Sequence, residues 1–204
     1  MRLLAVTKGQ SADVVRAAVD VGLVDVGESY PQELAAKAAE LDERAAEHGT
    51  EPPALRWHCI GRLQRNKVRQ IAPLVHLWQS IDRLSLAAEV ARRAPGAPVL
   101  VQVNVGDASQ QGGCAPTLAP SVVEGCTDLG LEVRGLMAIG VLGSPEGTRA
   151  GFRTLRTLAD SLGLAERSMG MSGDLEVAVE EGSTMVRVGQ ALFGPRGGST
   201  AVGK

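Results

Sequence analysis

Two basic side chains interrupt apolar runs of this chain, where their charge would be partly withdrawn from water. Lys8 follows LLAV at 3–6, and Arg187 lies within TMVRVG at 184–189. A partly desolvated lysine loses its proton more easily, and the neutral amine forms a Schiff base with an aldehyde. A solvated lysine at a strand end is the plain alternative. Because arginine is rarely buried alone, Arg187 either pairs with a carboxylate such as Glu28 or presents its guanidinium to a ligand.

Two glycine-containing segments near the end of the chain have the composition of a phosphate site. GMSGD at 170–174 offers the hydroxyl of Ser172 and free backbone N–H groups before a helical pattern, and VGQ at 188–190 adds Gly189. Backbone N–H groups at a helix start bind phosphate without a lysine or a Walker motif. Together the two segments can hold one phosphate. Taken alone, Ser172 would only cap its helix.

Short apolar runs alternate with amphipathic stretches along the chain. Strands are expected at 3–6, 23–27, 57–61, 77–81, 98–105, 131–139, 166–169 and 184–189, and helices at 11–21, 31–48, 66–72, 83–93, 116–129, 148–162 and 174–181. Eight such units predict a closed (β/α)8 TIM barrel of parallel strands, with a doubly wound open sheet as the alternative. We expect one domain over 1–196 and a flexible tail at 197–204. Functional side chains of such a barrel lie at the carboxyl ends of its strands.

Composition argues against several classes of function. The 204 residues carry 21 basic and 23 acidic side chains, and only two Trp, one Tyr and two Phe. Neither a cationic nucleic-acid surface nor a base-stacking platform is indicated. Three cysteines without a CxxC pair argue against a disulfide framework or a zinc site, and no other metal cluster is apparent. No apolar run is long enough to cross a membrane, so a cytoplasmic protein is expected.

Several segments, taken in order, resemble the YggS/PROSC-type pyridoxal-phosphate homeostasis proteins, whose barrel is alanine-racemase-like. The matching stretches are LLAVTK (3–8), VGESYPQE (26–33), WHCIGRLQRNK (57–67), SID (80–82), VQVN (101–104), RGLMAI (134–139), SMGMSGD (168–174) and GSTMVRVGQALFGPR (182–196). The patterns WHxIGxLQxNK and GSTxVRxGxxxFG are the specific ones. A barrel without the helix that usually precedes the family's first strand is expected, because this chain begins at that strand.

The resemblance implies that pyridoxal 5′-phosphate (PLP) is the cofactor. Lys8 matches the lysine of the Schiff base, and Arg187 matches the arginine that faces the pyridine nitrogen. The phosphate cradle is matched by Ser172, Gly189 and Gln190, with Ser168 and Thr184 nearby in the same motifs. Positions around the ring are matched by Met137 and Asn104. Ser29 is a further candidate, although it stands where the family's G-E-N-Y motif carries asparagine.

The arginine also bears on mechanism. A protonated Arg187 donates to the ring nitrogen and leaves it unprotonated, which makes the ring a weak electron sink. We therefore expect a monomeric PLP carrier without a catalytic cycle, which serves intracellular PLP homeostasis by releasing PLP to apo-enzymes. A PLP-dependent racemase of small amino acids is the alternative; it needs a second acid or base, and Tyr30 is the only tyrosine of the chain. A sugar-phosphate aldolase that uses Lys8 ranks third.

Overall fold

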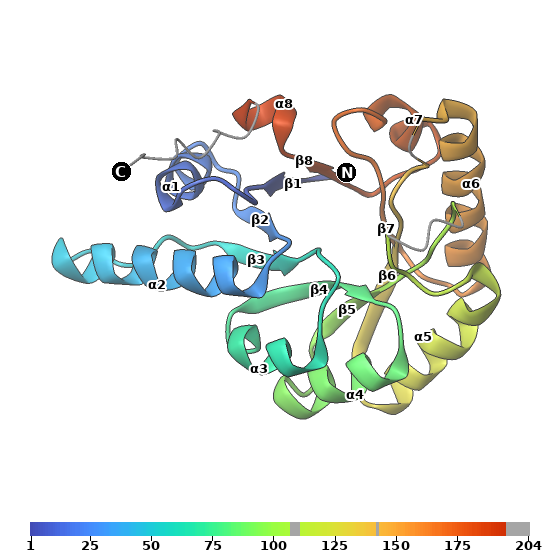
Figure 1. Ribbon diagram of the computed structural model, residues 1–204, viewed down its shortest axis with the longest axis horizontal. Coiled ribbons are helices and arrows are strands. Elements are labelled where there is room, and N and C mark those ends of the chain that lie inside the picture. The colour runs from blue at the N-terminus through green and yellow to red at the C-terminus, as the bar shows by residue number, and fades with distance from the viewer. Residues whose placement is uncertain (107–110, 142, 195–204) are drawn as a thin grey trace, which may run out of the picture.

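The strands form a closed parallel barrel in the order β1 to β8, and β1 pairs with β8 to complete it. The computed structural model (Figure 1) describes residues 1–106, 111–141 and 143–194. The strands are β1 (Arg2–Val6), β2 (Asp25–Glu28), β3 (Arg56–Cys59), β4 (Val75–Ile81), β5 (Pro98–Gln102), β6 (Glu132–Met137), β7 (Glu166–Ser168) and β8 (Met185–Val188). The predicted TIM barrel is confirmed, and the open-sheet alternative is wrong. The tail expected at 197–204 lies outside the described residues.

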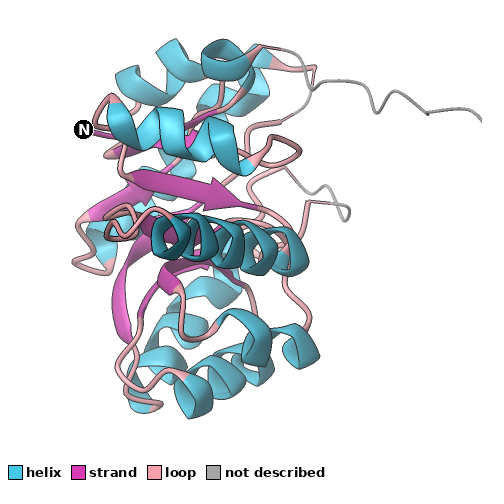
Figure 2. Cartoon of the chain, turned by 90° about the vertical axis from the view of Figure 1, so that its left-hand side faces the viewer, coloured by secondary structure: helices cyan, strands magenta, loops and turns pink. Residues whose placement is uncertain are grey.

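Helices surround the strands on the outside of the barrel (Figures 1 and 2). They are α1 (Ala12–Asp20), α2 (Pro31–Glu47), α3 (Val68–Ile71), α4 (Leu84–Arg93), α5 (Ala119–Asp128), α6 (Pro145–Ser161), α7 (Leu175–Glu180) and α8 (Gln190–Phe193), with 3₁₀ turns at Arg65–Lys67 and Pro116–Leu118. None of the described helices combines the length and apolar character that crossing a membrane requires.

Two element ends differ from the prediction for local reasons. Helix α6 begins three residues before the predicted 148, because Ser144 accepts a hydrogen bond from the Gly147 N–H (3.0 Å) and Pro145 occupies the first turn. Strand β5 ends at Gln102 rather than at 105. Beyond Gln102, Val103 forms an isolated parallel bridge with Cys114, which lies outside the named strands.

The apolar core has an outer and an inner part. The larger part fills the space between the strands and the helices, and it includes the buried, unpaired thiols of Cys59, Cys114 and Cys126. The inner part lies within the barrel and joins side chains of five strands, namely Leu4, Leu77, Leu100, Met137 and Met185. Because both faces of each strand are covered, the strands read in the sequence as nearly continuous apolar runs.

Candidate functional site

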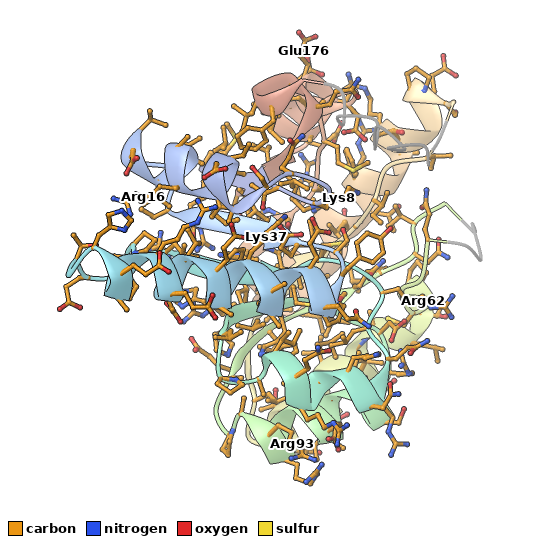
Figure 3. All side chains as sticks on the ribbon, turned by 60° about the vertical axis from the view of Figure 1, so that its left-hand side comes forward. Lys8, Arg16, Lys37, Arg62, Arg93 and Glu176 are labelled. Carbon is orange, nitrogen blue, oxygen red and sulfur yellow. The ribbon has the colours of Figure 1, made fainter. Side chains whose placement is uncertain are left out.

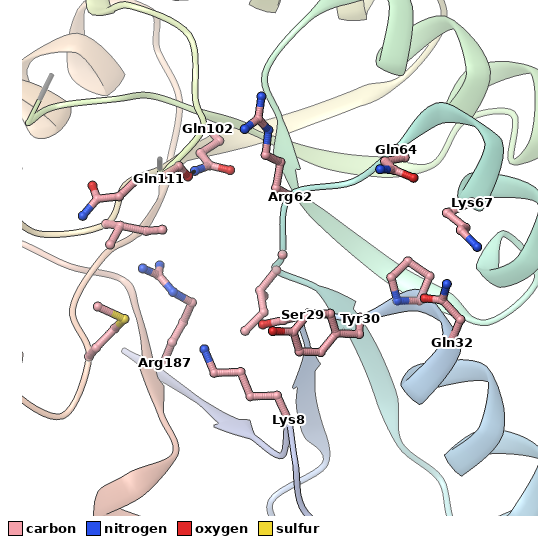
Figure 4. A pocket seen from close by; sticks show the side chains of 15 residues that line it. Lys8, Ser29, Tyr30, Gln32, Arg62, Gln64, Lys67, Gln102, Gln111 and Arg187 are labelled. Atoms are coloured by element: carbon pink, nitrogen blue, oxygen red, sulfur yellow. Dashed lines mark hydrogen bonds between the residues drawn. The ribbon is translucent and has the colours of Figure 1, made fainter. Parts of the chain in front are cut away.

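A pocket of about 530 Å³ opens at the carboxyl ends of the strands. Figure 4 shows the Lys8 amine directed toward the Arg187 side chain at one end of the pocket, and Gln32, Gln64 and Lys67 at the other. The lining also includes Ser29, Tyr30, Arg62, Gln102, Gln111, Ile139 and Met171. Four of the described lining residues are lysines or arginines and none is a carboxylate, so the pocket favours an anionic ligand.

Lys8 is held by contacts that its neighbours make on the outside of β1. The Lys37 amine donates to the Thr7 carbonyl oxygen (2.7 Å), and the Thr7 hydroxyl donates to Glu28 Oε1 (2.6 Å). The Gly9 N–H donates to Glu33 Oε1 (2.5 Å). These bonds fix the peptides on both sides of Lys8, while its side chain extends into the pocket.

The same contacts form a buried ionic cluster between β2 and α2. Figure 3 shows Lys37 on α2 and Lys8 in the loop that follows β1. The Lys37 amine lies 2.6 Å from both Glu28 Oε1 and Glu33 Oε1, and the Glu28 side chain is fully buried. Burial raises the pKa of Glu28, and the Lys37 and Thr7 contacts oppose that shift. We call Thr7, Glu28, Glu33 and Lys37 the Lys37 clamp.

Arg187 lies on the pocket floor and is bound by neutral oxygen atoms. Its Nη1 donates to both the hydroxyl and the carbonyl oxygen of Ser168 (2.8 Å each), and its Nη2 donates to the Ala138 carbonyl (2.7 Å). The alternative of an ion pair with Glu28 is wrong, because Glu28 points away from the barrel interior toward Lys37. Burial lowers the pKa of Arg187 to about 10, so its guanidinium stays charged at neutral pH.

The loops after β7 and β8 meet beside this pocket. Ser172 does not cap α7, whose preceding residue is Asp174; instead, the Ser172 hydroxyl accepts from the Ala191 N–H in α8 (3.4 Å). Gly189 directly precedes Gln190, the first residue of α8. A Cβ at Gly189 would lie 3.0 Å from the Val6 carbonyl oxygen, so the close approach to β1 favours glycine. The structure thus brings Ser172, Gly189 and Gln190 together.

Comparison with known proteins now decides the family. The model of the alanine racemase N-terminal domain matches residues 1–197. The pyridoxal phosphate homeostasis protein of Pseudomonas aeruginosa is 44% identical over 207 residues, which cover 95% of this chain and 84% of that protein. The protein of that name in Escherichia coli K12 is 35% identical, with 95% and 85% covered. This chain belongs to the pyridoxal phosphate homeostasis protein family.

Solved structures agree with that assignment. PipY of Synechococcus elongatus, solved with PLP bound, is 34% identical to this homeostasis family member, with a TM-score of 0.83 and coverage of 95% of this chain and 92% of that chain. A protein of Bifidobacterium adolescentis described as unknown is 38% identical, with a TM-score of 0.85 and coverage of 95% and 84%. Alanine racemase of Clostridium difficile shares the fold at 16% identity, and the match covers 52% of its chain.

The remaining predicted site residues lie at different depths in the barrel. Ser168 is fully buried beneath Arg187 at the end of β7. Met137 lies in the inner core, and Asn104 follows β5, where its side chain accepts from the Gly106 N–H (3.3 Å); neither lines the pocket. Thr184 precedes β8 at the opposite, amino end of the barrel and accepts there from the Arg167 N–H (2.7 Å). The structure does not bring Thr184 to the Ser172 loop.

Two pocket residues of this family member, Gln102 and Gln111, were missed in the sequence. The Gln102 side chain donates to the Gln111 carbonyl (2.8 Å), and the Gln111 side chain donates to the Gly140 carbonyl (3.2 Å). Gln102 carried a usable signal, because alternation along β5 places it on the same face as Leu100, inside the barrel. Gln111 carried none, because it lies between the predicted strands and helices and its place depends on contacts with Gln102 and Gly140.

Lowering the pH is expected to destabilise this protein through His58, a buried residue that bonds to Asp25 and Gln79 inside the barrel. Burial lowers the pKa of His58 below its ordinary 6.5. Below pH 6.5 the unfolded chain therefore takes up a proton that the folded chain excludes. The stabilisation is complete above pH 6.5 and is lost as the pH falls toward the folded-state pKa, at no more than about 1.4 kcal/mol per pH unit.

Urea unfolding at about pH 7.5 and about pH 5.5 measures this dependence. The variant His58→Asn should weaken it, whereas His48→Gln, at an exposed position after α2, should leave it unchanged. His76, whose pKa burial also lowers, adds a dependence of the same sign in every variant. If His58→Asn retained the full dependence of the wild type, the assignment to His58 would be refuted.

Proposed function

We propose that this protein binds PLP in the pocket at the carboxyl ends of its strands and serves PLP homeostasis by holding and releasing the cofactor. The observation that carries the proposal is the shared pocket of Lys8 and Arg187, beside the meeting point of the Ser172 and Gly189 loops. The PLP-bound structure of PipY supports it, because that protein shares the fold and about a third of the residues.

The residues present fit the three polar parts of PLP. PLP supplies an aldehyde that condenses with an amine, with loss of water, and Lys8 places its amine in the pocket. Ser172 offers a hydroxyl beside the backbone N–H groups at the start of α8, as a bound phosphate requires. Arg187 presents a charged donor for the pyridine nitrogen. We include Ser29 as a pocket-lining residue and Ser168 as the support of Arg187.

Arg187 favours a carrier over a racemase. Because its pKa of about 10 keeps it protonated at neutral pH, it donates to a ring nitrogen and leaves that nitrogen without a proton. A ring held in this way withdraws electrons weakly, which disfavours removal of a proton from a bound amino acid. The contacts of Arg187 therefore support storage and release of PLP rather than turnover.

We further propose a cytoplasmic, monomeric protein whose PLP passes to apo-enzymes. The three thiols support a reducing compartment, since all are buried and none is in a disulfide. Burial also raises the pKa of Cys59 to about 12 and that of Cys114 to about 11, which makes both unreactive.

Titration with PLP and mapping of the attached lysine test the proposal. The protein should develop a visible absorption band, and borohydride reduction followed by peptide mapping should place the adduct on Lys8. Ser172→Ala should weaken PLP binding by about tenfold or more, the effect of one lost hydrogen bond to a charged group. The same variant should bind pyridoxal, which lacks the phosphate, as the wild type does. A colourless protein without an adduct would refute the proposal.

A further inference from the structure

A single chain of polar side chains crosses the interior of the barrel. It begins at Arg56, whose Nε and Nη2 donate to the two oxygens of Asp25 (2.7 Å each). The bonds that follow are Asp25 Oδ1 to His58 Nε2 (3.0 Å), His58 Nδ1 to Gln79 Nε2 (2.8 Å), Gln79 Oε1 to the Ser168 hydroxyl (2.7 Å), and the Ser168 hydroxyl to Arg187 Nη1 (2.8 Å). This series of hydrogen-bonded side chains joins the first residues of β2 and β3 to the pocket floor.

Chemistry fixes the direction of every bond in this chain. Asp25 is ionised and only accepts, so His58 donates from Nε2. Burial lowers the pKa of His58, and the neutral ring therefore accepts at Nδ1. Gln79 must then direct its NH₂ group toward His58 and its carbonyl oxygen toward Ser168. The Ser168 hydroxyl donates to that carbonyl, and its oxygen atom accepts from Arg187.

Gln79 lies on β4 with its side chain in the interior of the barrel. It is fully buried, its neighbours include Leu77 on the same strand, and its NH₂ group also contacts the Met185 sulfur (3.1 Å). A polar group in such a place destabilises the fold unless it is fully hydrogen-bonded. The two polar ends of Gln79 bond to His58 and Ser168, with Met185 as a second contact of the NH₂ group, so Gln79 links His58 to the residues that hold Arg187.

We propose that Gln79 is a positioning residue, which acts through Ser168 to hold the Arg187 guanidinium in the orientation that meets a pyridine nitrogen. That Arg187 meets a pyridine nitrogen rests on the proposed function. The hydrogen bonds that orient the Arg187 guanidinium are present in the protein without PLP. Its anchor is the Asp25–His58 pair, far below the pocket and outside its lining. Residues at the amino end of the barrel thereby help to fix the orientation of Arg187 in the pocket.

Two substitutions separate positioning from general stability. Gln79→Leu removes the acceptor of the Ser168 hydroxyl, which then rotates and competes for the acceptors that bind Arg187. Gln79→Glu keeps an acceptor for the Ser168 hydroxyl, although it loses the donor to His58 and Met185 and introduces a carboxyl group. Thr184→Val is the matched control, because it removes a hydrogen bond at the amino end of the barrel. Thr184 does not belong to the series of side chains that links Arg56 to Arg187.

The test is the exchange of the Arg187 guanidinium protons with water, followed by NMR in ¹⁵N-arginine-labelled protein without PLP. We expect exchange to be faster by about tenfold in Gln79→Leu, as for one lost buried hydrogen bond, and no faster than in the wild type in Gln79→Glu and Thr184→Val. Labelled histidine should show the Nε2–H form of His58 in the wild type. Unchanged exchange in folded Gln79→Leu would overturn the proposal, as would equal acceleration in Thr184→Val.

Should Gln79→Leu fail to fold, Ser168→Ala removes the same link one step nearer to Arg187 and must accelerate the exchange. With PLP present, the pH dependence of the visible band should shift in Gln79→Leu but not in Thr184→Val. A wild type that forms no adduct with PLP would refute the proposed function, and the exchange measurement on the free protein would still decide the role of Gln79.

Discussion

Replacing Lys8 with alanine is expected to abolish the covalent attachment of PLP completely. Lys8 is the lysine that the Lys37 clamp fixes at the end of β1 with its side chain in the pocket beside Arg187. Without that amine, the aldehyde has no partner there, although the Ser172 loop and Arg187 still offer contacts to the phosphate and the ring. Weak binding without a covalent bond should therefore remain.

Mass spectrometry after borohydride treatment measures the attachment, and equilibrium dialysis measures the residual binding. Lys67→Ala is the matched control. Lys67 lines the same pocket, and it makes no ion pair among the described residues, so its removal changes the pocket charge equally. Lys67→Ala should keep the adduct. An adduct of undiminished yield in Lys8→Ala would show that another lysine reacts.

Replacing Lys37 with methionine is expected to lower the free energy of unfolding by about 3–5 kcal/mol, as when one partner of a buried ion pair is removed. The fully buried Glu28 carboxylate would lose its cation, and the Thr7 carbonyl would lose its donor. Attachment of PLP should also slow, because the peptide before Lys8 is no longer fixed.

Urea unfolding of the wild type, Lys37→Met and the double variant Lys37→Met/Glu28→Gln measures this loss. The double variant should be more stable than the single one, since no lone charge remains buried. Burial raises the pKa of Glu28 in the folded state, so the charge penalty grows as the pH rises through that value. Lys37→Met should therefore lose less stability at about pH 5 than at about pH 8. Equal losses at both pH values would contradict this account of Glu28.

The barrel was predictable because each strand is covered on both faces. A parallel strand buried in this way carries an apolar run that is visible in the sequence, and the helices between the runs showed their own periodicity. The two charged residues at one end of the pocket were predictable from the sequence for a related reason. Lys8 and Arg187 are charged residues beside or within such runs, and a charge there requires an explanation.

The supporting contacts were not predictable, because they join residues far apart in the chain. Gln79 contacts His58 and Ser168, which lie 21 and 89 positions away. Its one signal was the long polar side chain that it places, next to Ser80, within the strand LWQSI. The expectation for Thr184 shows the converse error. Thr184 and Gly189 belong to one motif, but the four residues of β8 lie between them, which places the two about 17 Å apart along the strand.

The Lys37 clamp also explains how two lysines near one strand can differ in chemical fate. The Lys37 ammonium donates to three oxygen atoms, those of Thr7, Glu28 and Glu33. A protonated amine has no lone pair to offer an electrophile, and here all three of its N–H groups are engaged. The fold thus protects one amine by complete coordination and directs its neighbour, Lys8, into the pocket. The difference between the two lysines follows here from where each amine is directed, Lys37 into the clamp and Lys8 into the pocket.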